Sequence, residues 1–590
     1  MKARLPMKLD DPETSRYAGL DDFEMFDTRD EDFFLDGPVS RRVAVLDFDT
    51  DNGTVLPGAR FADPGKRKLG GYECPAEEGI YGRSFQQVNA FATVLRTMYM
   101  YEEPDALGRR LTWAFGAPQL LVVPRAGEKA NAFYERESHS LQLFHISRAG
   151  RPPACACLSR DIISHETGHA ILDGIAPDLY NSLTPQSLAL HEAIADLTAL
   201  LMSFRSSKLR QAVLKATNGS IADSTAFATV APEFGMARDP TGAARYLRSL
   251  LNEKTLNRED TSLDENGVPN RVNRYEPHSL SEALSGALYT VMVKIHGALS
   301  TGYSGSGKAL FVGGERFKRM ILRALDYLPP GEVSFGDYGR AILASDQAAH
   351  PKDGQERQWI CEEFVRRALV PDKAALEVET NVRYRPLAKV ELQTLADSDW
   401  AAYRFADKNR EFLGIPDGIA FRVCPRLDTT KLYYRTKGAD PEPIRELIFK
   451  VSWDQEEPNG TGSPPLQIPG KRQITVGTTL AIDWETRTVR ARLTSQWKGE
   501  QPADRDEMLR KLAAAGALSE DGGAGLRVEK SNGVMRVRAT ARMLHVAAAV
   551  SSSEPKAPEP RPAPSSARPI PPPGVDAGAF YDLVEYRSRG

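Results

Sequence analysis

The sequence predicts an α+β protein in which strand-rich and helix-rich parts follow one another along the chain. Short apolar runs separated by turn signals fill residues 41–160, and apolar residues at helical spacing dominate residues 161–370. Short strand-like runs return over residues 371–550. Because 590 residues exceed one typical domain, we expect a β-rich N-terminal lobe, a helical lobe and a separate α+β accessory domain with these bounds.

Both ends of the chain differ from these parts in composition. Residues 10–36 hold eleven Asp or Glu against two Arg, so residues 1–40 are expected to form an acidic N-terminal arm. This arm is either solvated or docked on the body or on a partner. Nine prolines within residues 554–573 predict an extended, disordered tail over residues 551–590.

Local signals justify the elements of the N-terminal lobe. Asn52-Gly53 stands between two runs of alternating apolar residues and predicts a β-hairpin. Residues 84–101 carry apolar side chains at helical spacing and predict a helix. Two short apolar runs predict strands at 119–124 and 141–146.

Further signals place elements in the two later parts. Thr184-Pro185 combines an N-cap residue with a first-turn proline and predicts that a helix begins there. An amphipathic stretch over residues 504–517 interrupts the strands of the accessory domain. Those strands are predicted at 448–453, 473–477 and 488–494.

Composition excludes several classes of function. Lys and Arg number 76 and Asp and Glu 79, so no global basic field attracts nucleic acid. No uninterrupted apolar run approaches the roughly 18 residues that span a bilayer, and no hydrophobic signal segment follows Met1. The five cysteines are scattered and odd in number, which is not a disulfide framework. We therefore expect a cytoplasmic protein that binds neither nucleic acid nor membrane.

The strongest chemical signal is His165-Glu166-Thr167-Gly168-His169. Histidines at i and i+4 share one helix face, with Cβ atoms about 5–6 Å apart, so both imidazoles can reach one ion. Neutral imidazole is a preferred ligand of Zn²⁺. Glu166 follows the first histidine, where it can take a proton from a metal-activated water. The pattern predicts a zinc site that needs a third ligand.

The helix that begins at Pro185 offers this ligand. Glu192 and Asp196 are i, i+4 neighbours on it. Glu192 would complete a site of two His and one Glu, with the fourth position left to water, as in catalytic zinc sites. Asp196 would accept the free ring N–H of a ligating histidine and orient it. Alone, the two residues would read as a surface pair on an amphipathic helix.

His-Glu-x-x-His followed by Glu-x-x-x-Asp on the next helix resembles the gluzincins, specifically the thermolysin-like metallopeptidases. The resemblance covers about residues 40–370. It implies a β-rich lobe and a helical lobe with the zinc site in a cleft between them. His191 stands where thermolysin has Asn before the third ligand, and we expect it to be structural.

Further matches assign site residues by the same resemblance. Asn131-Ala132-Phe133-Tyr134 is similar to the family's edge strand, whose asparagine and main chain bind extended substrate. Tyr180 and His278 fall where the family has its two oxyanion donors, and Arg248 matches an arginine that contacts a substrate carbonyl. Glu276 either orients His278 or is a solvated loop residue.

The sequence thus predicts a zinc-dependent endopeptidase whose partner is a peptide or protein substrate. Glu166 would remove the water proton and pass it to the leaving amine. Tyr180 and His278 would stabilise the tetrahedral oxyanion. One alternative is a catalytically silent, zinc-stabilised scaffold that binds a protein partner through residues 371–590. Another is a zinc hydrolase of a non-peptide amide.

Overall fold

The structure is a computed structural model in which the chain divides into two compact units, Met1–Ser551 and Ser552–Gly590. The predicted tail over 551–590 lies outside the described residues. The description covers residues 1–539 except 21–22, 51, 63–64, 66–68, 115, 223–224, 239–245, 265–266, 304–306, 352–353, 434–441, 461–469, 496–500, 515 and 520–525.

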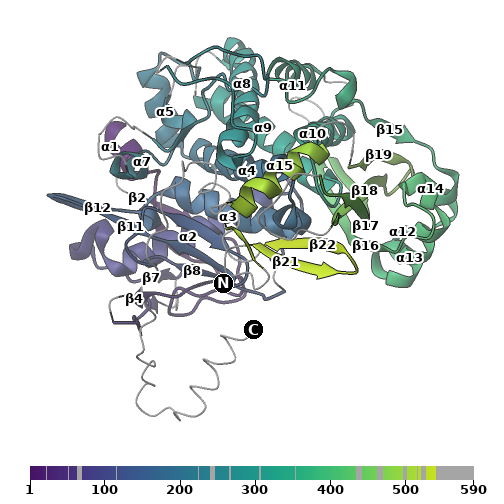
Figure 1. The fold of residues 1–590 in the computed structure, drawn as a ribbon. Helices are drawn as coiled ribbons and strands as arrows, with labels where there is room; N and C mark the ends of the chain where they lie inside the picture. The colour runs from purple at the N-terminus through teal and green to yellow at the C-terminus, as the bar shows by residue number, and fades with distance from the viewer. Residues whose placement is uncertain are drawn as a thin grey trace. The chain divides into compact units, whose positions relative to one another are not determined.

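A four-stranded sheet and one long helix form the centre of the N-terminal lobe (Figure 1). The strand order is β3 (Val43–Val45), β8 (Leu120–Val123), β10 (Ser140–Leu143) and β9 (Ala132–Glu135). β9 pairs antiparallel with β10 and leaves its other side unpaired in this sheet, so the predicted edge strand lies at an edge. The predicted helix is α2 (Arg83–Tyr101).

The predicted hairpin also forms in this lobe. β4 (Phe48–Asp49) pairs antiparallel with β5 (Thr54–Val55), and Gly53 has a φ of +64°, the left-handed conformation that such turns require. The remaining elements of this region are β6 (Phe61–Ala62), β7 (Gly71–Tyr72), η1 (Ala76–Tyr81), β11 (His145–Arg148), β12 (Arg151–Cys155) and η2 (Ala156–Leu158).

The first residues of the chain are built into the body, so of the two alternatives for the acidic arm the structure shows docking on the body and not a solvated arm. β1 (Arg4–Lys8) pairs with β2 (Phe23–Asp27), and α1 (Pro12–Tyr17) lies between them in sequence. Leu5 and Met7 are fully buried, a burial that stabilises by about 1.5–3 kcal/mol for each side chain. Acidic composition was misleading because the body supplies partners for buried acids of this segment: Asp10 pairs with Arg160, and Glu31 pairs with Arg42.

Helices dominate the next part of the chain, as predicted. α3 (Arg160–Ile175) packs against α4 (Pro185–Phe204), and α4 packs against α8 (Pro277–Tyr303). The other elements are η3 (Pro177–Asn181), α5 (Ser207–Ala216), α6 (Thr225–Ala228), β13 (Thr229–Val230), α7 (Pro232–Arg238), β14 (Arg248–Ser249), α9 (Gly307–Tyr327), α10 (Phe335–Ala349) and α11 (Gln355–Arg366).

Helix α4 begins at Pro185 as predicted, with one difference at its N-cap. The Thr184 side chain makes no capping hydrogen bond and instead donates to the Glu332 carboxylate. By length and composition α4 could cross a membrane, but its apolar window is 100% buried, which is also typical of a core helix.

The accessory region is a large, mostly antiparallel sheet with its own small helices. Its long strands are β16 (Phe421–Tyr433), β17 (Glu442–Pro458) and β18 (Lys471–Asp483). Its other elements are η4 (Ala374–Leu376), β15 (Glu379–Val382), η5 (Arg385–Lys389), α12 (Leu392–Asp397), α13 (Asp399–Lys408), α14 (Arg410–Leu413), β19 (Val489–Thr494), α15 (Gln501–Ala514), β20 (Leu518–Ser519), β21 (Leu526–Ser531) and β22 (Val534–Ala539).

This region is not a separate domain, which corrects the predicted division at residue 371. One face of β17, including Phe449 and Trp453, packs with α12 and α13 in a small second core. The opposite face places Ile448 in the main core, because side chains alternate along a strand. Helix α15 adds Met508 and Leu512 to that same main core. Residues 1–551 therefore form one compact unit.

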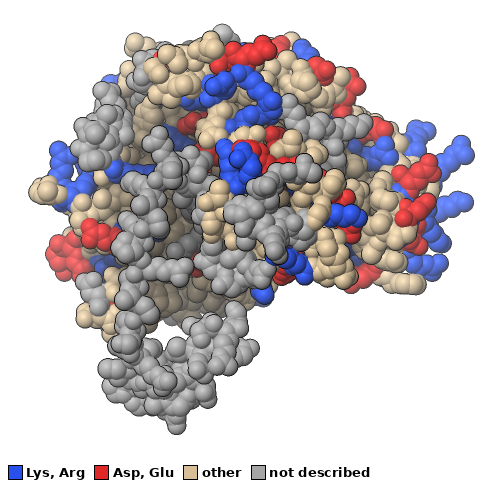
Figure 2. Space-filling view, in the orientation of Figure 1, with Lys and Arg blue, Asp and Glu red and all other residues tan. Residues whose placement is uncertain are grey.

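Charges of both signs are mixed on the visible surface. Figure 2 shows acidic and basic side chains interspersed where α12, α13 and α14 lie, and neither sign covers that end alone. This agrees with a formal net charge of -3. A buried ion cluster joins the accessory sheet to the helices: Lys431 lies 2.8 Å from Glu446 and 3.2 Å from Asp326, and all three side chains are fully buried.

Candidate metal centre

Helix α3 presents both histidines of the motif on one face. The Ser159 side chain caps the helix by accepting a hydrogen bond from the Ile162 N–H. His165 and His169, one turn apart, are 6% and 1% exposed. Their Nε2 atoms lie 3.1 Å apart, so the two rings converge on one point. Spacing along the helix alone accounts for this convergence.

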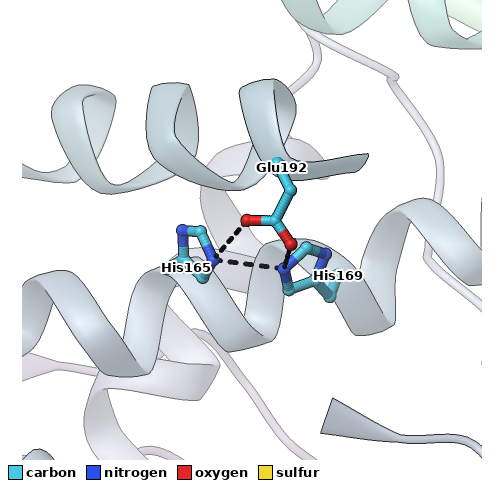
Figure 3. Close-up of side chains that lie close together, drawn as sticks. All are labelled: His165, His169 and Glu192. Atoms are coloured by element: carbon cyan, nitrogen blue, oxygen red, sulfur yellow. Dashed lines mark hydrogen bonds and ion pairs between the residues drawn. The ribbon is translucent and has the colours of Figure 1, made fainter. Parts of the chain in front are cut away.

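Glu192 reaches the same point from α4, as Figure 3 shows. Its Oε2 lies 3.5 Å from His165 Nε2, and its Oε1 lies 3.6 Å from His169 Nε2. The ligand atoms of the three residues all lie within 4.8 Å of one another. Gly168 permits the close approach of the helices, because a Cβ there would lie 3.2 Å from Ala195 Cα.

The donor set fits a divalent metal. Glu192 is fully buried, and within the described residues neither of its carboxylate oxygens has a hydrogen-bond partner. A buried, ionised carboxylate is stable only where it pairs with a cation or binds a metal, and the groups nearest to Glu192 are the imidazoles and the guanidinium of Arg248. Two imidazoles and one carboxylate with one position left open match the ligands of catalytic zinc.

A second carboxylate and an arginine support the site from behind. Asp196 Oδ1 lies 2.9 Å from His165 Nδ1, the ring nitrogen that faces away from Glu192. Arg248, on β14, donates to both oxygens of Asp196 at 2.9 and 2.7 Å. The same guanidinium lies 3.7 Å from Glu192 Oε2. Asp196 therefore holds His165 and Arg248 in fixed positions.

The electrostatics of the site favour a bound cation. Burial opposes the charged form of His165, yet the Asp196 and Glu192 carboxylates raise its pKa to about 10. Burial also opposes the ionisation of Glu192, but neighbouring imidazoles, His278 first and His169 next, hold its pKa well below its usual range. Clustered carboxylates thus draw a positive charge to the point where the ligand atoms meet.

Glu166 lies between the metal ligands and the edge of the sheet. Its Oε2 accepts a hydrogen bond of 2.9 Å from the main-chain N–H of Tyr134 on β9. Burial, first of all, raises the pKa of Glu166 to about 7, and the charge of Glu192 adds to this rise. A carboxylate with a pKa near neutrality can both accept and return a proton.

Of the two predicted oxyanion donors, His278 lies beside a candidate ligand and Tyr180 lies beside the edge strand. His278 begins α8, and its Nε2 lies 3.3 Å from Glu192 Oε2. Glu276 lies 2.9 Å from the other nitrogen of this ring, which favours the orienting role for Glu276. Tyr180, on η3, donates from its hydroxyl to the Tyr134 carbonyl at 3.4 Å.

The start of β9 brings the predicted substrate-binding residues to the same edge. Asn131 precedes the strand, and its side-chain oxygen accepts a hydrogen bond of 3.0 Å from the Ala132 N–H. Tyr134 directs its N–H to Glu166 and its carbonyl to Tyr180, away from β10. The unpaired side of β9 therefore faces the candidate metal centre.

One neighbour of the site, Arg136, was not singled out from the sequence. Arg136 donates to both oxygens of Asp173 on α3, and its guanidinium lies 4.8 Å from the centre of the Tyr180 ring. The Tyr134 hydroxyl donates to the same carboxylate at 2.8 Å. His191, expected to be structural, is fully buried with its Nδ1 3.4 Å from His169 Nδ1. These contacts join distant segments, so local spacing carries no signal for them.

A second group of carboxylates has a different explanation. Glu103, Asp105 and Glu315 lie close enough together to hold an ion. All three surround the ammonium group of Lys318, which is 1% exposed. The protein itself supplies the cation there, so this cluster is no competing metal centre.

Comparison with known proteins adds little to this geometry. No protein-family model matches the chain, and no curated protein matches it. One solved structure to which the chain is similar is described as the precursor of protealysin, a metalloproteinase from Serratia proteamaculans. The match covers 58% of this chain and 90% of that chain, with 14% identity and a TM-score of 0.33. At that distance the likeness carries no argument about function.

Proposed function

We propose that the protein is a zinc-dependent peptidase that hydrolyses internal peptide bonds. One observation carries this proposal: Glu166 lies between a buried set of His165, His169 and Glu192 and the free edge of β9. A metal site, a proton acceptor and an unpaired strand edge together are what hydrolysis of an extended peptide needs.

The chain supplies each role in the reaction. His165, His169 and Glu192 would hold Zn²⁺, which lowers the pKa of water and polarises a carbonyl when bound. Glu166 takes the proton of the attacking water and returns it to the leaving amine. Because the Tyr134 N–H engages only one oxygen of Glu166, the other oxygen remains for this transfer.

His278 and Tyr180 stabilise the charge that develops on the carbonyl oxygen. His278 lies beside Glu192 and Tyr180 lies beside the edge strand, and hydrogen-bond donors of this kind supply the largest single contribution in many enzymes. In the structure the Tyr180 hydroxyl donates to the Tyr134 carbonyl at 3.4 Å. Substrate binding would therefore require this hydroxyl to turn from a protein carbonyl to the substrate oxygen.

The edge strand favours internal cleavage over removal of N-terminal residues. Asn131, Ala132 and Tyr134 carry amide and main-chain groups of the kind that pair with a peptide continuing in both directions. In the structure the Ala132 N–H binds Asn131 and the Tyr134 groups bind Glu166 and Tyr180, so a bound peptide would replace contacts of these groups. A free α-amino group would instead need a carboxylate. Glu135, on the same strand, has an oxygen occupied by the Ser138 hydroxyl and by the Gln142 amide at 3.0 Å.

The test uses the zinc-loaded full-length protein and two substrates, an N-acetylated internally quenched peptide and an aminoacyl fluorophore. We expect about one zinc per chain and turnover of the acetylated peptide only. Glu166→Gln should keep the zinc and lose turnover by about 10²–10⁴-fold. His169→Ala should lose the metal.

Each other outcome favours a different function. Turnover of the aminoacyl compound alone would contradict the internal-cleavage proposal. A stably bound zinc with no hydrolysis of any amide would favour the silent scaffold. Full zinc content in a His165→Ala/His169→Ala double variant would overturn the metal site itself.

A further inference from the structure

A polar cavity of about 370 Å³ lies between η3 and the accessory sheet. Residues from the helical part and from strands β16, β18 and β22 line it, and β22 packs directly against η3. The charged residues in its lining are Arg136, Arg422, Arg536, Arg538, Asp178 and Glu332. Basic groups therefore outnumber acidic ones.

The arginines of the accessory sheet are only partly neutralised. Arg422 and Arg536 both bind the carboxylate of Asp454, at 3.0 Å each. Thr475 donates to the same carboxylate at 2.9 Å. Two guanidinium groups thus share one carboxylate, and the negative charge of Asp178 also acts on Arg422. Arg538, on β22, pairs with Glu529 of the neighbouring strand β21 at 3.4 Å, and both side chains are exposed.

The two acidic residues of the lining are engaged with the protein. Asp178 Oδ2 accepts a hydrogen bond of 3.0 Å from the Gly331 N–H. Glu332 accepts from the Thr184 hydroxyl and lies 3.5 Å from the buried Arg505. Both acids keep their negative charge, but guanidinium groups outnumber them four to two in the lining, and guanidinium groups bind carboxylates well, which favours an anionic ligand.

The cavity lies where the substrate edge ends. Arg136 directly follows β9 and is fixed on Asp173 of α3 and on the Pro177 carbonyl of η3. It stands two positions after Tyr134, whose N–H binds Glu166, a distance of about 7 Å along a strand. A peptide lying antiparallel on β9 runs its N-terminal part toward Arg136.

We propose that this cavity binds an acidic side chain of the peptide substrate, a few residues N-terminal to the cleaved bond. The proposal rests on the peptidase function proposed above and names its substrate class. At that end of an antiparallel peptide the C-terminal carboxylate is absent, so a side chain of Asp or Glu must supply the anion. The accessory sheet would then contribute substrate selection to the catalytic lobes.

The experiment compares quenched peptides that are identical except for Glu or Gln at each of several positions N-terminal to the cleaved bond. A further set of peptides carries Glu or Gln on the C-terminal side of the cleaved bond. For the wild-type chain we expect kcat/KM to be about tenfold higher with Glu at one N-terminal position, the size of one charged hydrogen bond. We expect no gain with Glu on the C-terminal side.

Variants locate the preference in the cavity. Arg536→Gln and Arg538→Gln should each lower the Glu-to-Gln ratio of kcat/KM toward one. Arg538→Gln should leave the fold intact, because the Arg538 side chain is half exposed and its partner Glu529 is exposed too. Arg426→Gln is the matched control: it lies on β16 like Arg422 and pairs with Asp399, outside the cavity lining. It should keep the wild-type ratio.

The outcomes separate this proposal from the peptidase proposal. Equal turnover of Glu and Gln peptides by an active wild-type enzyme would overturn the subsite and leave the peptidase intact. The subsite would also be overturned, and the peptidase proposal left intact, if both variants keep the preference for Glu. A preference for Glu on the C-terminal side of the cleaved bond would have the same meaning. If no peptide is cleaved, binding of labelled Glu and Gln peptides to Glu166→Gln protein, measured by fluorescence anisotropy, decides whether the cavity selects an acid.

Discussion

The main-chain N–H of Tyr134 donates a 2.9 Å hydrogen bond to Oε2 of Glu166, which ties the edge strand of the sheet to the helix that carries His165 and His169. The proposed proton acceptor and the proposed substrate strand are therefore positioned by one contact. A change in β9 should alter the chemistry as well as substrate binding, and the predictions below separate such roles.

His278→Ala should lower kcat by about 10²–10³-fold while zinc content and KM stay close to wild type, because an oxyanion donor acts on the transition state. Steady-state kinetics measure kcat and KM, and elemental analysis measures the zinc content. His350→Ala is the matched control, since His350 also lies beside a carboxylate, at 3.2 Å from Asp346, and is similarly exposed. A His278→Ala enzyme with wild-type kcat would make this histidine a bystander.

Asp196→Asn should weaken zinc affinity by about 10–100-fold, the usual effect of removing a carboxylate that orients a metal-binding histidine. Competition with a fluorescent chelator measures it. Asp173→Asn is the control, because Asp173 is equally buried and pairs with an arginine, Arg136, but has no recorded contact with a proposed ligand. Equal zinc affinity in the Asp196 variant and wild type would show that His165 needs no such partner.

Asp11 should make stability depend on pH. Burial, then the charge of Glu233, raise its pKa in the folded state from 3.8 to about 7. Between these values the folded state binds more protons than the unfolded state, so the contribution of Asp11 to stability falls as pH rises through this window. Relative to Asp11→Asn, the wild-type chain should be less stable at pH 8 than at pH 5.

Urea unfolding of both chains at the two pH values measures this difference. Asp407→Asn is the control, since Asp407 is exposed on the surface and pairs with Arg410. This variant shows the effect of the same substitution at an exposed carboxylate that pairs with an arginine. If the Asp11 variant shows a pH-independent difference, the buried carboxyl does not titrate in this range.

A chain that ends at Val370 should lose cooperative thermal unfolding. Such a chain lacks β17 and α15. The part of the main core where Ile448, Met508 and Leu512 pack is then exposed to solvent. Each buried side chain contributes about 1.5–3 kcal/mol, against a total stability of about 5–15 kcal/mol. Circular dichroism melting measures the loss. A chain that ends at Ser551, where the two compact units divide, is the control and should melt as the full chain does.

A truncated chain with an unchanged melting curve would instead mean that the catalytic lobes fold alone. The role of the accessory region in substrate selection could then be measured directly by deletion. With the shared core observed here, point variants such as Arg536→Gln test that role without unfolding the protein.

Local spacing determined that two of the three proposed ligands share a helix face, and packing of α4 on α3 brings the third to them. His165 and His169 share a helix face because they are four residues apart, and Pro185 sets the start of the helix that carries Glu192. The hairpin at Gly53 and helix α2 were predictable for the same reason, since turn residues and apolar periodicity act over a few positions. The sequence predicted Glu192 as the third ligand because Glu192 and Asp196 are i, i+4 neighbours on the next helix.

Contacts between distant segments were decided only by the tertiary structure. The acidic N-terminal segment is buried because Leu5 and Met7 pack inside, although its composition favoured solvent. The accessory region joins the main core because the two faces of β17 pack against different partners. The cavity beside Arg136 exists because β22 reaches η3 from more than 350 positions away in sequence. Sequence spacing specifies which side chains share a helix face or a turn, but packing of whole elements decides which faces meet.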